Sequence, residues 1–323
     1  MIRASVNLIP DAPVGNVVDL ALLAEQLGFQ RCWVYDEGLA MRDVYVTMTA
    51  IALATTTMQI GPGITNAYTR HPAQTAAAIA SLDELSGGRA FLGIGAGGSL
   101  TLGPLAIDRS HPLEAVHSTI EACRALFGGS PVTFNSRTVT LRDATLGFAR
   151  PDIAIWLAGR GPKMLELGGR VADGVMLDFI HKDTMADYVE LVRSGAESSG
   201  RPMPKLCYST MIVTDDDSLD EVRAHMTYRL VDSPPKVRDL LGLTDADINQ
   251  IREAMGAGLH AAGKLVKDEW VLPFVIHGTK QECGREVATM MRTYGFDEFM
   301  LPVLDLDNAA SYIERVADAL NAA

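Results

Sequence analysis

The chain has 323 residues and a mass of 34.7 kDa, and its 48% hydrophobic and 21% charged residues are ordinary values for a globular protein. This composition excludes disorder as the main state, and the length allows a large core without a disulfide or a metal. The net charge of -12, from 28 Lys and Arg against 40 Asp and Glu, argues against nucleic acid or an anionic membrane as the main partner.

Short apolar strands alternate with amphipathic helices along most of the chain. The first half predicts strands over 2–9, 31–35, 58–64 and 90–94, and helices over 14–28, 43–56, 73–86 and 112–127. A surface hairpin is predicted where 132–134 and 138–140 flank Asn135 and Ser136. The second half predicts strands over 153–157, 174–177, 206–213 and 299–303, and helices over 162–171, 184–198, 280–293 and 309–320. Residues 215–272 are richer in charge and predict several short helices instead.

Strands that are separated by helices run parallel, because each helical crossover returns the chain to the same end of the sheet. Eight such units predict the α/β class and a (β/α)8 TIM barrel, with 215–272 as a helical insertion after strand seven and 1–323 as a single domain. The rival is an open, doubly wound sheet. In both folds, ligands bind at the C-terminal ends of the strands.

A glycine run after the fourth strand matches the G-x-G-x-x-G pattern of dinucleotide-binding folds. The run is 93–98, but that motif also needs a helix that begins at once. Residues 99–104 are predicted to be a loop, and the next helix begins only at Pro112. The sequence therefore disfavours a Rossmann site, and the glycines either turn the backbone at a barrel rim or let a flat ligand approach it.

The loop Ala158–Lys163 joins a predicted strand to a predicted helix and contains two glycines. Pro162 suits the first helical position, where a missing N–H costs nothing. Free amides and the helix dipole favour an anion there, and Lys163 can add charge. A plain strand-to-helix turn is the alternative interpretation.

A pair of carboxylates, Asp36 and Glu37, ends the second predicted strand. Acids at a strand's C-terminal end are candidates for general acid–base chemistry in a barrel. The long, glycine-marked loop 61–72 follows the third strand and would lie at the same rim. The alternative is that one of the two acids serves only a helix end or a salt bridge.

The cysteine pattern indicates a reducing compartment, and we expect the protein to be cytoplasmic. The four cysteines are scattered, without a C-x-x-C pair or a zinc spacing: Cys32, Cys123, Cys207 and Cys283. The seven histidines form no tight cluster either, so no metal site is expected. No apolar run is long enough to span a membrane, and Asp11 and Pro13 interrupt any signal-peptide core.

Five stretches of the chain together resemble the bacterial luciferase-like superfamily, and within it the branch that depends on the deazaflavin coenzyme F420. These stretches are 21–29, 61–72, 81–89, 93–95 and 159–174. The resemblance is nearest to the methylenetetrahydromethanopterin reductases of that branch and thins after about residue 180. It implies a (β/α)8 barrel with an insertion after strand seven, and two-electron hydride transfer instead of oxygen chemistry.

The resemblance also implies which residues meet the cofactor. Asp36 would lie near the deazaflavin ring, and Gly63, Ile64 and Thr65 would line one ring face, with a cis peptide bond between Gly63 and Ile64. The phosphate and the ribityl chain would be held by two further sets of residues. These are Gly95, Ala96, Gly97 and Thr101, and then Ala158, Gly159, Gly161, Pro162, Lys163 and Met164. We expect a homodimer that acts on a small-molecule substrate.

Three positions depart from the pattern of the reductases. The resemblance implies an acid where this chain has Asn7, a histidine where it has Glu37, and an acid where it has Gly98. We therefore expect a substrate other than methylenetetrahydromethanopterin, with Glu37 as the remaining candidate proton donor beside Asp36 and Asn7. Two alternatives stay open: an FMN-dependent monooxygenase of the same superfamily, and a catalytically inactive homologue that binds a cofactor.

Overall fold

The computed structural model describes residues 2–322, apart from the side chains of residues 99, 100, 216 and 217. The barrel strands are β1 (Ala4–Leu8), β2 (Arg31–Val34), β3 (Gln59–Pro62), β4 (Thr65–Asn66), β5 (Leu92–Gly95), β8 (Ile155–Ala158), β9 (Gly174–Asp178), β10 (Lys205–Ser209) and β13 (Glu298–Val303). The helices around them are α1 (Val14–Gln26), α2 (Val44–Ala54), α3 (Pro72–Ser86), α5 (Pro112–Phe127), α6 (Pro162–Val171), α7 (Met185–Ser198), α13 (Lys280–Tyr294) and α14 (Ala309–Asn321).

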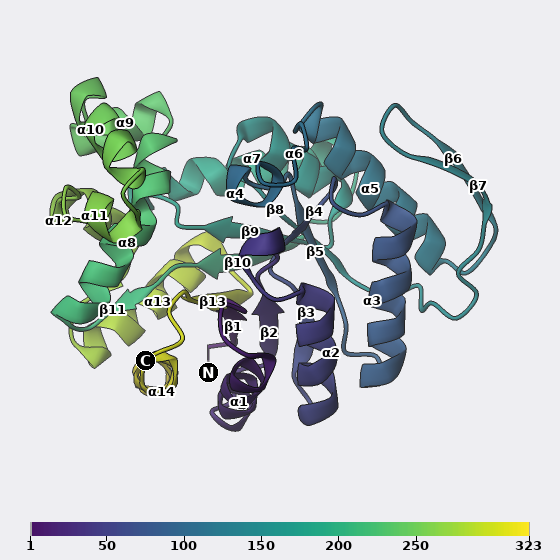
Figure 1. The fold of residues 1–323 in the computed structure, drawn as a ribbon, viewed down its shortest axis with the longest axis horizontal. Helices are drawn as coiled ribbons and strands as arrows, with labels where there is room; N and C mark the ends of the chain where they lie inside the picture. Colours follow the sequence, from purple (N-terminus) through teal and green to yellow (C-terminus); the bar gives the residue numbers. More distant parts are fainter. Residues whose placement is uncertain (1, 323) are drawn as a thin grey trace.

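The parallel sheet closes on itself through its third strand. The order is β3-β2-β1-β13-β10-β9-β8-β5-β4, and β3 and β4 are the two halves of one interrupted strand. Because β3 pairs with β2 and β4 pairs with β5, that strand joins both edges of the sheet. The predicted (β/α)8 barrel is therefore confirmed, and Figure 1 shows its helices packed around the strands.

The predicted insertion after the seventh barrel strand is also present. It contains α8 (Asp216–Val231), α9 (Pro235–Leu241), α10 (Asp245–Met255), α11 (Leu259–Gly263) and α12 (Asp268–Val271). The strands β11 (Ile212–Val213) and β12 (Ile276–His277) lie before and after the insertion in the sequence, and they pair as a two-stranded parallel sheet. The insertion helices gather at one end of the molecule, drawn in green in Figure 1. The predicted hairpin, β6 (Val132–Asn135) and β7 (Thr140–Ala144), lies at the opposite end.

The structure corrects three of the predicted elements. The stretch 99–104 is not all loop, because Ser99–Leu102 forms the single-turn helix α4. The strand predicted over 58–64 breaks after Pro62 and resumes at Thr65, where the chain bulges into the barrel rim. The strand predicted over 206–213 divides into β10 and β11, which belong to different sheets. Apolar composition alone marks neither break, because hydrophobic residues occur on both sides of each.

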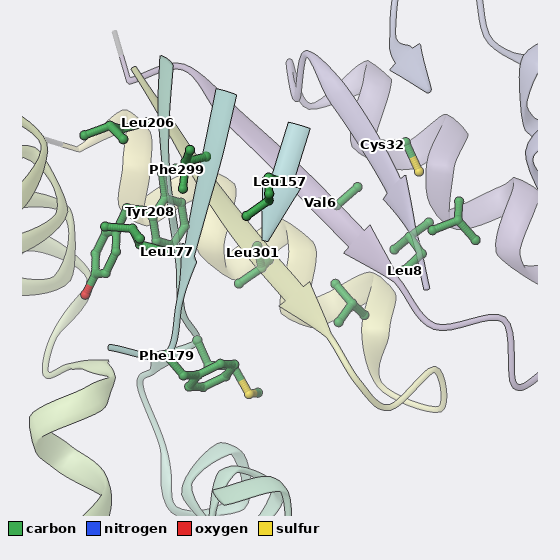
Figure 2. Close-up of a cluster of buried hydrophobic side chains, with 14 of the residues drawn as sticks. Val6, Leu8, Cys32, Leu157, Leu177, Phe179, Leu206, Tyr208, Phe299 and Leu301 are labelled. Carbon is green, nitrogen blue, oxygen red and sulfur yellow. The ribbon is translucent and has the colours of Figure 1, made fainter. Parts of the chain in front are cut away.

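Residues along the barrel strands alternate between the inside of the barrel and the surrounding helices. Outward side chains such as Leu177, Tyr208 and Phe299, from neighbouring strands, belong to the main core between strands and helices (Figure 2). The inward set forms a separate cluster: Trp33, Phe91, Trp156, Met176, Cys207 and Met300. The rings of Trp33 and Trp156 meet at 5.5 Å although their strands are not adjacent in the sheet, as only contact across the interior allows.

A buried ion pair fills the N-terminal end of the barrel interior. Arg31 Nη1 lies 2.7 Å from Glu298 Oε2, and both side chains are almost fully buried. The guanidinium also packs over the rings of Trp33, Phe91 and Trp156, at 4.6 to 5.4 Å from their centroids. A second bond to Glu298 comes from Trp33 Nε1 at 3.3 Å. This end of the barrel is therefore closed, and a ligand can enter only from the opposite end.

Removing the carboxylate of this pair is expected to destabilise the fold strongly. In Glu298→Gln the Arg31 charge stays buried without a counter-charge, so the free energy of unfolding should fall by about 3–5 kcal/mol. The double variant Arg31→Met/Glu298→Leu leaves no unpaired charge of this pair in the barrel, so its free energy of unfolding should fall by less than that of the single variant. Denaturant unfolding followed by circular dichroism measures both. A single variant as stable as the wild type would contradict this view of the barrel floor.

Several residues of the stretches that resemble the luciferase-like family hold the scaffold together. Glu25 accepts hydrogen bonds from the backbone amides of Thr56, Thr57 and Met58, at the start of the third strand. Arg89 donates to the carbonyls of Ala52, Thr55 and Met58 and so caps the C-terminal end of α2. These residues support the barrel away from the ligand end.

Candidate functional site

Polar side chains gather at the C-terminal ends of the strands, where the interior opens. The alternation that fills the barrel with aromatic rings continues to Asn7, Asp178 and Ser209 at the ends of β1, β9 and β10. Gly95 and Ala158 end β5 and β8 on the same face and leave room above the floor. The structure therefore brings the strand-end residues of the sequence prediction to one rim.

The break in the third strand is held by Asn7. Its Nδ2 donates to the Gly63 carbonyl at 2.7 Å, and the peptide bond between Gly63 and Ile64 is cis. A Cβ on Gly63 would lie 2.5 Å from Trp33 Cβ and 2.6 Å from Asn7 Oδ1, so only glycine fits there. Asn7 is 1% exposed and thus supports the bulge from below, at the position where the reductase pattern implies an acid.

The two carboxylates of the second strand are held by threonines from different segments. Asp36 Oδ2 accepts from Thr65 Oγ1 at 2.6 Å, and Glu37 Oε2 accepts from Thr101 Oγ1 at 2.8 Å. Burial raises the pKa of Asp36, although the Thr65 hydroxyl opposes this shift. Burial also raises the pKa of Glu37, against the Thr101 bond, and the neighbouring Asp36 raises it further. Glu37 therefore keeps its proton to a higher pH than an exposed carboxyl does.

This raised pKa makes a prediction about stability. The folded state binds the Glu37 proton more tightly than the unfolded state, so the stabilisation is complete below the unfolded pKa of about 4.3 and is lost as pH rises through the folded pKa. Glu37→Gln cannot ionise. Its melting temperature relative to wild type should therefore rise, by a few degrees, between acidic and mildly alkaline pH. Thermal unfolding at a series of pH values measures this, with the exposed Glu84→Gln on α3 as control. A difference that does not change with pH would contradict it.

Glycines at the end of β5, the fourth barrel strand, and just after it let the backbone lie close to the neighbouring segments. A Cβ on Gly95 would lie 2.3 Å from Ile64 Cδ1 and 2.9 Å from the Ala158 carbonyl. Gly97, with φ of 70°, lies close to Asn66 and Leu102. Thr101, on α4, is buried, and its hydroxyl group donates a hydrogen bond to Glu37. Thr101, which the sequence predicts to contact the cofactor, is therefore also the hydrogen-bond partner of the candidate acid Glu37.

The β8–α6 loop has the geometry of an anion site. Gly161 is the N-cap of α6 and Pro162 its first residue, as expected from the sequence. Among the described residues, no acceptor meets the backbone amides of Gly161 and Lys163. A Cβ on Gly161 would meet nothing within 4 Å, so its surroundings are open. Lys163 is exposed, and the Met164 side chain packs under Gly159.

Sequence reasoning missed a second polar group at this rim. Asp178 accepts a bond from Ser209 Oγ at 2.7 Å and forms an ion pair with Arg229 of α8, whose Nη1 also donates to the Asp178 carbonyl at 3.1 Å. Tyr35 and Arg229 are close enough for the charge of Arg229 to lower the pKa of Tyr35, which burial raises. Asp178 carries the same signal as Asp36, a carboxylate at a strand's end, and could have been found. Arg229 lies 51 residues further along the chain and carries no such signal.

Among the side chains that the structure describes, no group of three His, Cys, Asp or Glu residues is arranged to bind a metal ion. No helix among residues 2–322 has the length and the apolar character needed to cross a membrane.

Comparisons with known proteins agree on one family. Residues 1–298 match the family model described as luciferase-like monooxygenase. The 5,10-methylenetetrahydromethanopterin reductase of Methanolobus tindarius is 32% identical and aligns over 88% of this chain and 90% of its own. That of Archaeoglobus fulgidus is also 32% identical, over 87% of both. The solved coenzyme F420-dependent tetrahydromethanopterin reductase of Methanopyrus kandleri is similar with a TM-score of 0.88, at 26% identity, over 98% of this chain and 97% of that one.

Proposed function

Because this chain belongs to the luciferase-like monooxygenase family, we propose that it is an oxidoreductase that uses coenzyme F420 and a small organic substrate. The observation that carries the proposal is the likeness to a solved F420-dependent reductase across nearly the whole of both chains.

The residues at the rim fit such a cofactor. The free amides at the start of α6 suit its phosphate, and Gly161 leaves space for close approach. Two buried polar atoms of the rim, Asn7 Oδ1 and Asn66 Nδ2, have no protein partner among the described residues. Buried polar groups are rarely left unpaired, so these atoms support a ligand with polar groups of its own.

The residues that would hold the cofactor come from four strand ends. For the ring they are Asp36, Gly63, Ile64 and Thr65. For the ribityl chain and phosphate they are Gly95, Ala96, Gly97, Thr101, Ala158, Gly159, Gly161, Pro162, Lys163 and Met164. The interior aromatic cluster below them closes the barrel and keeps water from the floor of the site.

When bound, a deazaflavin supplies two-electron hydride chemistry. Glu37 would act as the general acid that donates the proton accompanying hydride transfer. Its Oε2 is fixed by Thr101, its Oε1 has no partner among the described residues, and its raised pKa favours the protonated form. Burial raises the pKa of Glu37 most, and repulsion from Asp36, which is itself hydrogen-bonded to Thr65, raises it further. Asn7 acts as a positioning residue through the Gly63 carbonyl.

The purified protein can be titrated with F420 and with FMN, in oxidised and reduced forms, and then assayed with a panel of small alcohols, ketones and imines. We expect tight F420 binding and turnover that is visible as a change in deazaflavin absorbance. Co-purified FMN with NADH-linked oxygen uptake would instead assign an FMN-dependent monooxygenase. Binding without turnover across a broad panel would assign an inactive homologue.

We further propose that the chain is a single domain that works as a homodimer in the cytoplasm. All four cysteines are free, as a reducing compartment leaves them. The outward face of α2 carries exposed apolar side chains, Val46 at 60% and Leu53 at 69% exposure, which support self-association. Light scattering coupled to size-exclusion chromatography measures the mass, and a monomer at micromolar concentration would contradict the dimer.

A further inference from the structure

Tyr35 directly precedes the two acids of the second strand and is not one of the proposed cofactor contacts. Its backbone amide donates to the Leu8 carbonyl at 3.1 Å, so the chain is still extended beside β1 at this residue. Side chains alternate along an extended chain, and Trp33, two residues earlier, belongs to the cluster inside the barrel. The half-buried Tyr35 ring is therefore the next layer above the aromatic floor and points into the mouth of the barrel.

A neighbour from the opposite wall supports this direction. Arg229 is fixed at the end of β9, where it pairs with the Asp178 carboxylate and donates to the Asp178 carbonyl at 3.1 Å. Three strands, β1, β13 and β10, separate β2 from β9 in the sheet. Burial raises the pKa of the Tyr35 phenol, and the charge of Arg229 nonetheless opposes this shift from across the barrel. Tyr35 and Arg229 therefore face each other over the mouth.

Glu37 borders the same space as the Tyr35 hydroxyl. After burial and Arg229, the charge of Glu37 also affects the pKa of Tyr35, so the two groups are neighbours. Thr101 holds Glu37 Oε2 at 2.8 Å and leaves Oε1 without a partner among the described residues. The Tyr35 hydroxyl has no hydrogen-bond partner among them either. Burial raises the pKa of both groups, so both favour the protonated form, which donates a hydrogen bond.

Two donors that border one space suit the oxygen of a carbonyl group. A carbonyl oxygen has two lone pairs and accepts two hydrogen bonds, whereas the nitrogen of a neutral imine has one lone pair and that of an iminium ion has none. Arg229 is already paired with Asp178 and adds no free cation that would select a carboxylate. We propose that Tyr35 contacts the substrate and, together with Glu37, binds the oxygen of an aldehyde or ketone. The inference rests on the proposed function and names the substrate class of that site.

The two donors have different roles in the reaction. The carbonyl carbon takes a hydride from the reduced cofactor, the π electron pair of the carbonyl moves to the oxygen, and that oxygen takes the proton of Glu37. The carbonyl is thereby reduced to an alcohol, the cofactor is oxidised by two electrons, and water returns a proton to Glu37. Tyr35 keeps its proton, because burial raises the pKa of a group that is already a weak acid. Its hydrogen bond stabilises the negative charge that develops on the oxygen.

The test uses reduced F420 with two sets of neutral substrates of similar size, aldehydes and ketones in one set and cyclic imines in the other. We expect kcat/KM of wild type to be about 10-fold or more higher for the best carbonyl than for the best imine, the worth of one hydrogen bond. Tyr35→Phe removes only the hydroxyl, so kcat with carbonyls should fall by about 100-fold. Turnover of imines and the affinity for F420, measured by fluorescence titration, should not change.

Tyr294→Phe is the matched control, since it removes the same hydroxyl from the end of α13, outside the barrel, and should match wild type in every assay. A wild type that prefers imines would overturn the inference and leave the proposed function standing. Unchanged carbonyl turnover in a folded Tyr35→Phe protein, or an equal loss with both substrate sets, would also overturn it.

Tyr228→Phe separates the two tyrosines near the candidate acid. Burial raises the pKa of Tyr228, on α8, and the charge of Glu37 raises it further, so this hydroxyl faces Glu37 from the insertion. We expect carbonyl turnover to fall more in Tyr35→Phe than in Tyr228→Phe, because Tyr35 points into the mouth from the barrel itself. A loss confined to Tyr228→Phe would overturn the assignment of Tyr35. If F420 does not bind, or supports turnover of neither set, the proposed function fails, and this inference fails with it.

Discussion

The variant Gly161→Val is expected to fold normally and to bind coenzyme F420 about 30- to 1,000-fold more weakly than wild type, a loss of about 2–4 kcal/mol. A Cβ at this position meets no protein atom within 4 Å, and the backbone φ of -76° suits any residue. The cost therefore falls on the ligand, because the branched Cβ occupies the space through which a phosphate reaches the free amides of Gly161 and Lys163. Fluorescence quenching during titration measures the affinity.

Gly147→Val is the control for this experiment. Gly147 is exposed, a Cβ there also meets nothing within 4 Å, and the residue lies in the loop before β8, outside the site. Its cofactor affinity should equal that of wild type. Unchanged affinity in a folded Gly161→Val protein would remove the β8–α6 loop from the cofactor site.

Replacing the candidate acid should affect turnover instead of binding. In Glu37→Gln the bond from Thr101 can persist, but no proton can be donated, so kcat is expected to fall by roughly 10²–10⁴-fold while F420 affinity changes little. Wild-type kcat should also fall as pH rises through the raised pKa of Glu37, since the protonated form is the active one. The glutamine variant should lose this alkaline limb.

Thr101→Val tests the same assignment in a different way. The Thr101 hydroxyl stabilises the ionised carboxylate, so its loss should raise the pKa of Glu37 and move the alkaline limb of kcat to higher pH. A purely structural role for the pair predicts a lower kcat with an unmoved limb. Wild-type turnover in Glu37→Gln would exclude Glu37 from the chemistry.

The barrel could be predicted because its signals are local. Strand and helix periods differ, and two crossover helices, α3 and α6, begin at a proline that follows a glycine-containing loop. The elements that were wrong lack such a signal. Helix α4 is one turn long, and its Thr101 is held by a bond to Glu37, 64 positions away. The division between β10 and β11 depends on which sheet each segment pairs with, a choice made between residues far apart in the chain.

The sequence by itself placed Asp36, Glu37, Gly95 and the β8–α6 loop after parallel strands, and hence at one rim of the barrel. Only the tertiary structure decided what each of these residues contacts. Thr65 and Thr101 became the partners of the two acids, and Arg229 came from the insertion to meet Asp178. The physical reason is that periodicity depends on neighbours within a turn or two, whereas hydrogen bonds and ion pairs at a barrel rim join residues whose separation along the chain is arbitrary.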